Sequence, residues 1–305
     1  MRTTFANTLT QLMDEHPEII CVTADMGFSV FEGLQETYPK RFLNTGVTEQ
    51  SSVGLAAGLA LSGHKVFFYA QAAFATMRCF EQVRLDVGYN NIDVKIIGTA
   101  AGFSLNQLGA SHFAIEDVGL MRMIPNMTVF TPGDPAEVAW ATHKAYEING
   151  PAYIRLMKSG TPIVHNGKIN VKIGEMIPMT QGKGTCILVS GSLLPQAVEL
   201  TEKLTGEGLR VALFSVPTIK PLNSKALIKE ISGIPSVITI EEHSVIGGLG
   251  SAVAEIIAEA GVKTKLLRLG IQDQFTSITG SQEYLLDYNG LSPKKLYQSI
   301  KKFLR

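Results

Sequence analysis

The chain has 305 residues, of which 45% are hydrophobic, and its 27 basic residues balance its 27 acidic residues. No surplus of positive charge is available to neutralise phosphates, so the composition argues against a nucleic-acid or anionic-membrane partner. The length exceeds that of a usual single domain and predicts two domains, each with its own core.

The first 160 residues alternate between apolar runs and amphipathic stretches, a pattern that predicts an α/β domain. Six apolar runs are expected to be strands, at 19–23, 41–44, 65–69, 94–98, 127–130 and 152–156. Continuous apolar runs of this kind are typical of parallel strands that helices cover on both faces. We therefore predict a doubly wound, mainly parallel-sheet domain over residues 1–160.

Residues 161–184 break this alternation with several glycines and prolines, and we interpret them as a linker. The alternation resumes over 185–305 in a smaller unit. Its expected strands are at 186–190, 210–214, 237–240 and 265–269. The predicted fold class is thus α/β with two doubly wound domains, the second smaller than the first.

The three cysteines, Cys21, Cys79 and Cys186, are an odd number set far apart in apolar stretches. This pattern predicts buried thiols in a reducing compartment, and it argues against a disulfide framework or a metal site. The first residues enter helical periodicity without a signal-peptide core, and no apolar run reaches membrane-spanning length. We expect a cytoplasmic protein with a small-molecule task and no metal held by its own residues.

Three side chains follow predicted strands, at the sheet edge where α/β proteins bind ligands. Glu49 follows the run 41–44 and opens a helix, although a lone Glu in a first helical turn is more often explained by the helix dipole. Phe74 lies beyond the run 65–69, where its ring could face a ligand or belong to the core. His112 ends a long loop rich in small residues, and taken alone it could be an ordinary loop histidine.

Several familiar motifs are missing from the sequence. There is no Walker loop, G-x-G-x-x-G fingerprint, H-E-x-x-H, C-x-x-C or G-x-S-x-G elbow. The sequence therefore gives little support to nucleotide binding by this chain alone.

The candidate residues fall within longer stretches that together resemble the transketolase family, and the resemblance covers nearly the whole chain. These stretches are residues 45–58, 80–84, 116–127, 218–222 and 241–250. The first resembles the motif of thiamine-diphosphate enzymes in which a Glu follows a strand and precedes an Ala/Gly-rich helix. No Gly-Asp-Gly motif for magnesium occurs. The chain thus resembles only the C-terminal section, a pyrimidine-binding domain followed by a C-terminal domain.

The resemblance implies roles around the cofactor. Glu49 would hydrogen-bond the aminopyrimidine of thiamine diphosphate, where a buried neutral carboxyl can donate to a ring nitrogen. Phe74 is the best match to the ring that stacks on the pyrimidine, with Phe68 and Tyr69 as alternatives. Asp25 aligns with a family acid near the cofactor, and capping of the following turn is its other interpretation.

The resemblance also implies substrate contacts. His112 matches a catalytic histidine that contacts substrate oxygens, and Lys158 falls where many relatives have an Arg for the sugar phosphate, although a solvated charge explains Lys158 equally well. Two positions depart from the family pattern: Gln107-Leu108 replaces a Glu-Asp pair, and Ala100 replaces a histidine. A site that cannot pair a substrate hydroxyl discriminates against it, so the common ketose phosphate is not assured as the substrate.

The resemblance implies the C-terminal subunit of a two-chain transketolase, which transfers a two-carbon ketol unit from a ketose, expected to be phosphorylated, to an aldose through thiamine diphosphate. An N-terminal partner subunit would hold the diphosphate and Mg2+, and a heterotetramer is expected. Two alternatives stay open: the β subunit of an oxoacid dehydrogenase E1 component, and a catalytically silent α/β assembly subunit.

Overall fold

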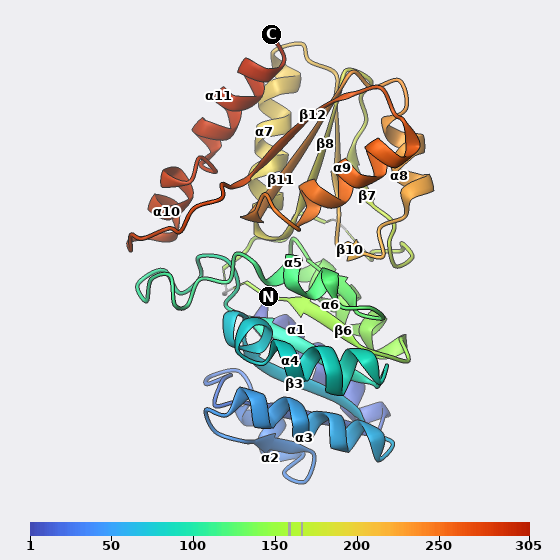
Figure 1. The fold of residues 1–305 in the computed structure, drawn as a ribbon, viewed down its shortest axis with the longest axis vertical. Helices are drawn as coiled ribbons and strands as arrows, with labels where there is room; N and C mark the ends of the chain where they lie inside the picture. Colours follow the sequence, from blue (N-terminus) through green and yellow to red (C-terminus); the bar gives the residue numbers. More distant parts are fainter. Residues whose placement is uncertain (158–159, 166) are drawn as a thin grey trace.

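The computed structural model describes residues 1–157, 160–165 and 167–305 and has two α/β units stacked along its long axis (Figure 1). The first contains a seven-stranded sheet in the order β10-β5-β6-β4-β3-β1-β2. Its strands are β1 (Ile19–Thr23), β2 (Phe42–Asn44), β3 (Lys65–Gln71), β4 (Val94–Thr99), β5 (Thr128–Phe130), β6 (Ala152–Arg155) and β10 (Thr218–Lys220). All neighbouring pairs are parallel except β10 with β5.

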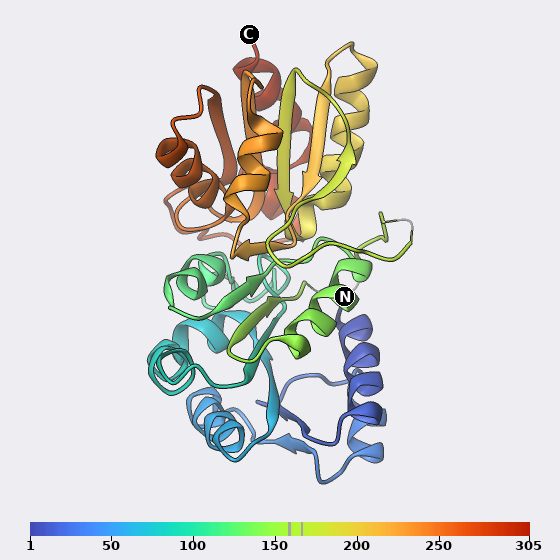
Figure 2. The ribbon, with the colours of Figure 1, turned by 90° about the vertical axis from the view of Figure 1, so that its right-hand side faces the viewer.

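Helices cover both faces of this sheet, as Figure 2 shows with the sheet seen near its edge. One face packs against α1 (Arg2–Glu15), α2 (Glu32–Thr37) and α6 (Pro135–Glu147). The other packs against α3 (Glu49–Leu61), α4 (Phe80–Gln82), α5 (Asp117–Met123) and two π-helical segments, η1 (Phe74–Arg78) and η2 (Val83–Tyr89). Every residue of β1 and β4 is buried, as two-sided covering requires.

The second unit has a five-stranded sheet in the order β12-β11-β8-β9-β7. Its strands are β7 (Ile177–Thr180), β8 (Thr185–Ser190), β9 (Val211–Ser215), β11 (Ser236–Ser244) and β12 (Lys265–Ile271). Its helices are η3 (Gly191–Leu193), α7 (Leu194–Gly206), α8 (Ser224–Ile231), α9 (Leu249–Ala260), α10 (Gln282–Tyr288) and α11 (Pro293–Phe303). The prediction of two α/β units with mainly parallel sheets is confirmed.

Two short strands depart from the simple two-domain picture. β10 comes from the second half of the sequence yet pairs antiparallel with β5 of the first sheet. β7 lies inside the expected linker 161–184 and forms the antiparallel edge of the second sheet, a position that tolerates its Pro178. The boundaries 1–160 and 185–305 stay a prediction, and β10 shows that the two units are interwoven at their junction.

The three cysteines are buried and free, as the sequence predicts. Burial raises the pKa of both Cys79 and Cys186 to about 12, which leaves these thiols protonated at neutral pH. Among the described residues, no helix is both long and apolar enough to cross a lipid bilayer.

A buried ion pair lies where the two units meet. Arg155, at the end of β6, donates through Nε to both carboxylate oxygens of Asp117, at 2.9 and 3.2 Å. Its Nη2 donates to the carbonyls of Ala114 and of Glu242, which belongs to β11. Arg155 therefore joins the first sheet, the start of α5 and the second unit through one guanidinium.

A glycine makes room for this junction. Tyr153 donates its hydroxyl to Asp117 Oδ2 at 2.6 Å, and its ring lies over Gly98 of the neighbouring strand. A Cβ at Gly98 would lie 2.4 Å from the Tyr153 hydroxyl oxygen, which is closer than atoms can pack. The absence of a side chain at residue 98 thus allows Tyr153 to reach Asp117.

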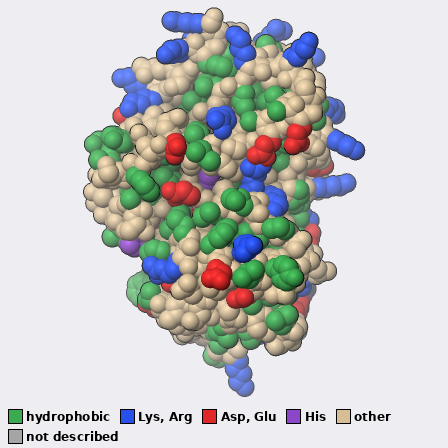
Figure 3. All heavy atoms as spheres, viewed as in Figure 1, with side chains coloured by type: hydrophobic (Ala, Val, Ile, Leu, Met, Phe, Trp, Pro, Cys, Tyr) green, Lys and Arg blue, Asp and Glu red, His purple; other side chains and the backbone are tan. Residues whose placement is uncertain are grey.

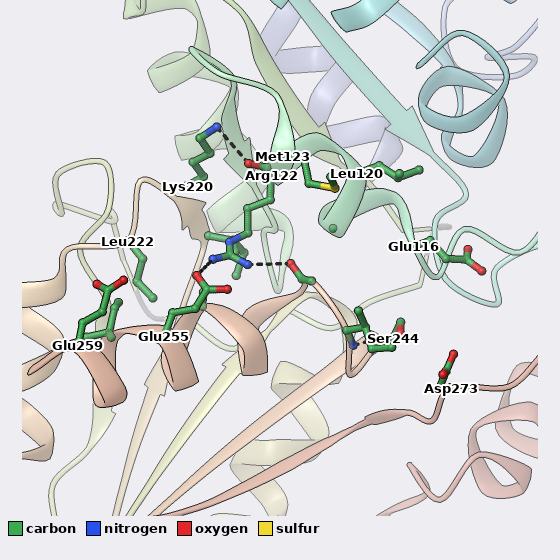
Figure 4. Close-up of a pocket in the computed structure, with 16 residues that line it drawn as sticks. Glu116, Leu120, Arg122, Met123, Lys220, Leu222, Ser244, Glu255, Glu259 and Asp273 are labelled. Carbon is green, nitrogen blue, oxygen red and sulfur yellow. Dashed lines mark hydrogen bonds and ion pairs between the residues drawn. The ribbon is translucent and has the colours of Figure 1, made fainter. Parts of the chain in front are cut away.

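We predict that Asp117→Asn lowers the free energy of unfolding by about 3 kcal/mol or more, because it leaves the buried cation of Arg155 without its countercharge. Urea denaturation followed by circular dichroism measures this change. The control is Glu255→Gln, since Glu255 pairs with Arg122 at the surface (Figure 4) and such exposed pairs contribute only about 0 to 1 kcal/mol. Equal effects of the two substitutions would contradict the structural role of the buried pair.

A second polar cluster joins the N-terminus of α6, the segment before β7 and the end of β9. His165 Nε2 lies 2.6 Å from Glu137 Oε1, which also accepts from the Ser215 hydroxyl at 2.5 Å. Asp134 accepts from the backbone N–H groups of Val164 and His165. Burial lowers the pKa of His165, but the hydrogen bond and charge of Glu137, together with Asp134, raise it more, so the net pKa lies above its ordinary value.

We predict that this cluster stabilises the fold more at low pH than at high pH. A histidine with a raised folded-state pKa contributes stability that is fully present below its unfolded pKa and is lost as the pH rises through the folded value. His165→Gln should therefore cost about 2 kcal/mol at pH 6, the scale of a hydrogen bond to a charged group, and less at pH 9. Urea unfolding at both pH values checks this, with the exposed His143→Gln as control. A cost that does not depend on pH would contradict the prediction.

Candidate active site

Glu49 is the first residue of α3, and its side chain is buried although the helix begins at the surface. Its residue exposure is 3%. Its Oε2 accepts a hydrogen bond of 2.8 Å from Arg78 Nη1, and within the described residues Oε1 has no partner. No backbone N–H of its own first turn bonds to this carboxylate in the described part of the chain. Glu49 therefore points toward a side chain from another segment and does not cap its helix.

Arg78 connects Glu49 to an aromatic ring. Its guanidinium carbon lies 3.9 Å from the centroid of the Phe74 ring, a distance typical of a cation–π contact. Phe74 and Arg78 are the first and last residues of the π-helical segment η1, and π-helical turns are rare and often found at functional sites. The two side chains therefore lie together on one turn, four positions apart.

Gln71, the last residue of β3, fixes the position of this turn. Its Oε1 accepts from the Phe74 N–H at 3.1 Å, and its Nε2 donates to the carbonyl of His112 at 2.8 Å. The Phe74 and His112 rings meet edge to face with centroids 5.0 Å apart. One buried amide thus holds together the turn that carries Phe74 and the loop that carries His112.

Parallel pairing explains why these residues meet. Gln71 and Thr99, the last residues of β3 and β4, are partners in the ladder. The segments that follow them, η1 and the loop ending at His112, therefore leave the sheet side by side. Glu49 follows β2 at the same carboxyl edge. The predicted residues Glu49, Phe74 and His112 are brought together, with Arg78 as the link.

The second unit supports the base of the His112 loop. Glu242 of β11 accepts from the Phe103 N–H at 2.8 Å and also from the Ser192 hydroxyl. A Cβ at Gly102, which has a φ of +59°, would lie 2.4 Å from Glu242 Oε1. Phe103 and Phe113, near the two ends of the loop, pack edge to face at 5.0 Å within the core of the second unit. Burial raises the pKa of Glu242, opposed by these hydrogen bonds.

The alternative ring residues lie inside β3, away from the cluster. Phe68 is fully buried in the hydrophobic core on one face of the sheet, and Tyr69 is fully buried on the other face. The Tyr69 hydroxyl donates to Thr99 Oγ1 at 2.9 Å. Of the three rings considered in the sequence, Phe74 alone contacts Arg78 and His112 among the described residues.

Asp25 lies at a neighbouring position on the same edge of the sheet. It has a φ of +52° just after β1, and its backbone N–H donates to Asn44 Oδ1 at 3.0 Å. Both residues line a small cavity of about 140 Å³ beside α2. No hydrogen bond joins Asp25 to Glu49, Arg78 or His112 in the described part of the chain.

The remaining predictions concern residues at positions expected to contact the substrate. Lys158 lies outside the described residues. Ala100 follows β4 with a φ of +54° and is buried, whereas Gln107 and Leu108 are exposed in the loop before His112. Because residues 107 and 108 are Gln and Leu, this part of the loop presents no carboxylate.

A separate groove of about 780 Å³ lies between the two units, lined by α5, β10 and α9. Figure 4 shows Arg122 crossing it to reach Glu255 and the carbonyl of Gly247, while Lys220 donates to the carbonyl of Arg122. None of the predicted site residues lines this groove. It is therefore distinct from the cluster around Glu49.

Sequence reasoning missed Arg78 and Gln71. A signal existed for both: Gln71 is a polar residue that ends an apolar run, and Arg78 follows Phe74 by four positions, the spacing at which helical side chains meet. Together the cluster offers a buried carboxylate, a partly buried aromatic face and a histidine at one edge of the sheet. This set can bind a planar, hydrogen-bonding ring and place a polar group beside it.

Two family models match the chain: the transketolase pyrimidine-binding domain over residues 1–163 and the transketolase C-terminal domain over residues 174–296. A protein of Methanocaldococcus jannaschii, provisionally described as a transketolase C-terminal section, is 36% identical over 303 residues, which are 98% of this chain and 95% of that protein. One of the subunits of an apulose-4-phosphate transketolase from Actinobacillus succinogenes is 37% identical over 254 residues, covering 83% of this chain and 82% of that relative.

A solved structure gives the same result at the level of the fold. It is described as a split-gene transketolase in an inactive β4 tetramer. It is similar to this chain with a TM-score of 0.89 and 36% identity, over 99% of this chain and 97% of that one. The likeness therefore extends over both α/β units.

We predict that Gln71→Leu loosens the His112 loop. The substitution leaves the Phe74 N–H and the His112 carbonyl without their buried partner, so the free energy of unfolding should fall by about 1 to 3 kcal/mol. Amide hydrogen exchange over residues 105–112 should become faster. The exposed Gln107→Leu is the control and should change stability by less than about 0.5 kcal/mol. Unchanged exchange in Gln71→Leu would show that the amide does not hold the loop.

Proposed function

This chain belongs to the transketolase family, and from that premise we propose that it is the C-terminal subunit of a split, thiamine-diphosphate-dependent transketolase. It would transfer a two-carbon ketol unit from a ketose to an aldose. The three buried free thiols support a cytoplasmic location.

The observation that carries this proposal is the buried Glu49 carboxylate beside the Phe74 ring. An aminopyrimidine needs a carboxyl group to hydrogen-bond its ring nitrogen and an aromatic face on which to stack. Both are present, and the guanidinium of Arg78, itself planar and rich in N–H groups, already contacts the two together at 2.8 and 3.9 Å. The residues therefore fit an aminopyrimidine.

We assign the following roles to the residues of this chain. Glu49 holds the pyrimidine nitrogen and moves a proton at that atom, and its burial keeps water away from the exchange. Phe74 stacks on the ring and His112 contacts substrate oxygens, while Asp25 contributes near the cofactor. Lys158 binds the anionic group of the sugar. Thiamine diphosphate, when bound, supplies the electron sink for breaking and forming the carbon–carbon bond.

The substrate is expected to be a ketose with an anionic group. The relative in Actinobacillus succinogenes is named for apulose-4-phosphate, which supports a phosphorylated sugar. Leu108 and Ala100 stand at two positions where many relatives have polar groups, so sugar hydroxyls that meet these positions would lack partners. The donor is therefore expected to differ from that of a common transketolase in the groups presented at these two positions.

The proposed partner is an N-terminal subunit that holds the diphosphate and Mg2+. Hydrophobic side chains gather on the face over α3, α4 and α5 (Figure 3), and Leu55, Met77, Leu85 and Tyr89 are exposed in this region of the sequence. The outer side of α3 carries glycines with open space around them. A face that is apolar and close to Glu49 suits burial against a second chain. Two copies of each subunit are expected, with two-fold symmetry.

We predict that Glu49→Gln lowers ketol transfer by at least about 100-fold, because the amide cannot supply the acid and base forms of the carboxyl. The assay combines the chain with its N-terminal partner, Mg2+, thiamine diphosphate and a panel of ketose phosphates and aldoses. The exposed Glu202→Gln on α7 of the second unit is the control and should keep full activity.

Three results would contradict the proposal in different ways. Full activity of Glu49→Gln would remove the assigned role of Glu49. Release of carbon dioxide from pyruvate with transfer to a lipoyl acceptor would identify an oxoacid dehydrogenase E1 β subunit. Absence of thiamine diphosphate binding by the assembled complex would identify a silent assembly subunit.

A further inference from the structure

Arg78 has no assigned role, yet it lies between the two groups that the proposed cofactor site requires. Its Nη1 donates to Glu49 Oε2 at 2.8 Å, and its guanidinium carbon lies 3.9 Å from the centroid of the Phe74 ring. Building on the proposed function, we infer that Arg78 is a placeholder: in the unpartnered chain its guanidinium occupies the aminopyrimidine position, and it must leave when the cofactor binds.

The two contacts locate the guanidinium in the same space as the proposed ligand. A ring that hydrogen-bonds Glu49 and stacks on Phe74 has to lie between these side chains, and the guanidinium lies there. Both groups are flat, and both present N–H donors at their edge. The space between the Glu49 carboxylate and the Phe74 ring face can thus hold one flat group or the other, but not both together.

The other contacts of Phe74 support displacement of Arg78 over displacement of His112. The His112 ring meets Phe74 edge to face, and its backbone carbonyl is held by Gln71. Arg78 has no such anchor, because its side chain is 42% exposed and its guanidinium bonds only Glu49 among the described residues. The guanidinium is therefore the group that can swing into solvent while the Gln71 bonds stay intact.

The direction of the hydrogen bond between Arg78 and Glu49 determines how Arg78 affects the proposed role of Glu49. A guanidinium has donors and no acceptor, so Glu49 accepts in the contact with Arg78. The role proposed for Glu49 requires it to donate to a ring nitrogen. While Arg78 remains in place, Glu49 Oε2 is therefore committed to the opposite hydrogen-bonding role, and the site is closed to its ligand.

The strength of the Arg78 contacts with Glu49 and Phe74 determines how much Arg78 weakens cofactor binding. An exposed cation–π contact and a partly exposed ion pair are both weak interactions. Breaking them together corresponds to roughly a five- to thirtyfold loss of affinity for any ligand that must displace them. Arg78 would thus weaken cofactor binding without preventing it, and it would occupy the space between Glu49 and Phe74 until the cofactor displaces it.

The test measures thiamine diphosphate binding by the assembled two-subunit complex with Mg2+, using isothermal titration calorimetry. Arg78→Ala should bind thiamine diphosphate about five- to thirtyfold more tightly than the unmodified complex. Arg78→Gln, which keeps a donor for Glu49 but loses the cation–π contact, should fall between the two. Arg210→Ala removes an exposed arginine from the second unit and should leave the affinity unchanged.

The outcomes separate this inference from the proposed function. If thiamine diphosphate binds and Glu49→Gln weakens its binding, but Arg78→Ala binds equally or less tightly, the placeholder inference alone is wrong. If the unmodified complex binds no thiamine diphosphate, the proposed function is wrong, and the placeholder inference, which rests on it, is wrong as well. Arg78→Gln guards against misfolding of the alanine variant, because the ordering of affinities has to hold for a folded, conservatively substituted chain as well.

Discussion

The buried guanidinium of Arg155 is the constraint on which the rest of the molecule depends. A cation sealed from water has to be paired, and here Asp117, the carbonyl of Ala114 and the carbonyl of Glu242 supply its partners. These groups come from the start of α5, the end of the His112 loop and the second sheet. Because all three have to reach one point, the relative position of the two units and the path of the loop are set together. Arg155 thereby fixes Ala114, two residues beyond His112, while Gln71 holds the His112 carbonyl beside Phe74.

The second unit contains none of the predicted site residues, and its contribution is to hold the loop that carries one of them. Glu242 accepts a hydrogen bond from the Phe103 N–H at one end of the loop. At the other end of the loop, the Ser244 N–H donates to the carbonyl of Ile115. Phe103 and Phe113 are buried in the core of this unit. With both ends fixed in this way, the loop can vary at residues 104–112 without losing its base. Exposed positions such as Gln107 and Leu108 can therefore differ in sequence while the fold is kept.

The cluster around Glu49 combines a buried acid with an open surface. Glu49 and Gln71 are sealed within the first unit, whereas Met77 and Arg78 on the adjoining turn are exposed. The π-helical segment η1 produces this division, since Cys79 Sγ donates back to the carbonyls of Phe74 and Ala75 and anchors the inner side of the turn. A site built in this way presents a buried acid on one side and an exposed turn on the other, and under the proposed function a second chain would cover the exposed side. That is the physical sense in which the chain carries half of a proposed active site.

The sequence alone determined the fold class, the strands of both sheets other than β7 and β10, and the position of Glu49 at a carboxyl edge. These follow from patterns of apolar and polar residues within about ten positions, which report burial directly. Tertiary structure decided that Phe74 contacts the cluster while Phe68 and Tyr69 fill the two faces of the sheet, and that β10 joins the first sheet. It also decided that Glu49 pairs with Arg78, 29 positions along the chain. Burial is a local property of the sequence, whereas the partner of a polar side chain depends on which distant segments the fold brings to the same edge.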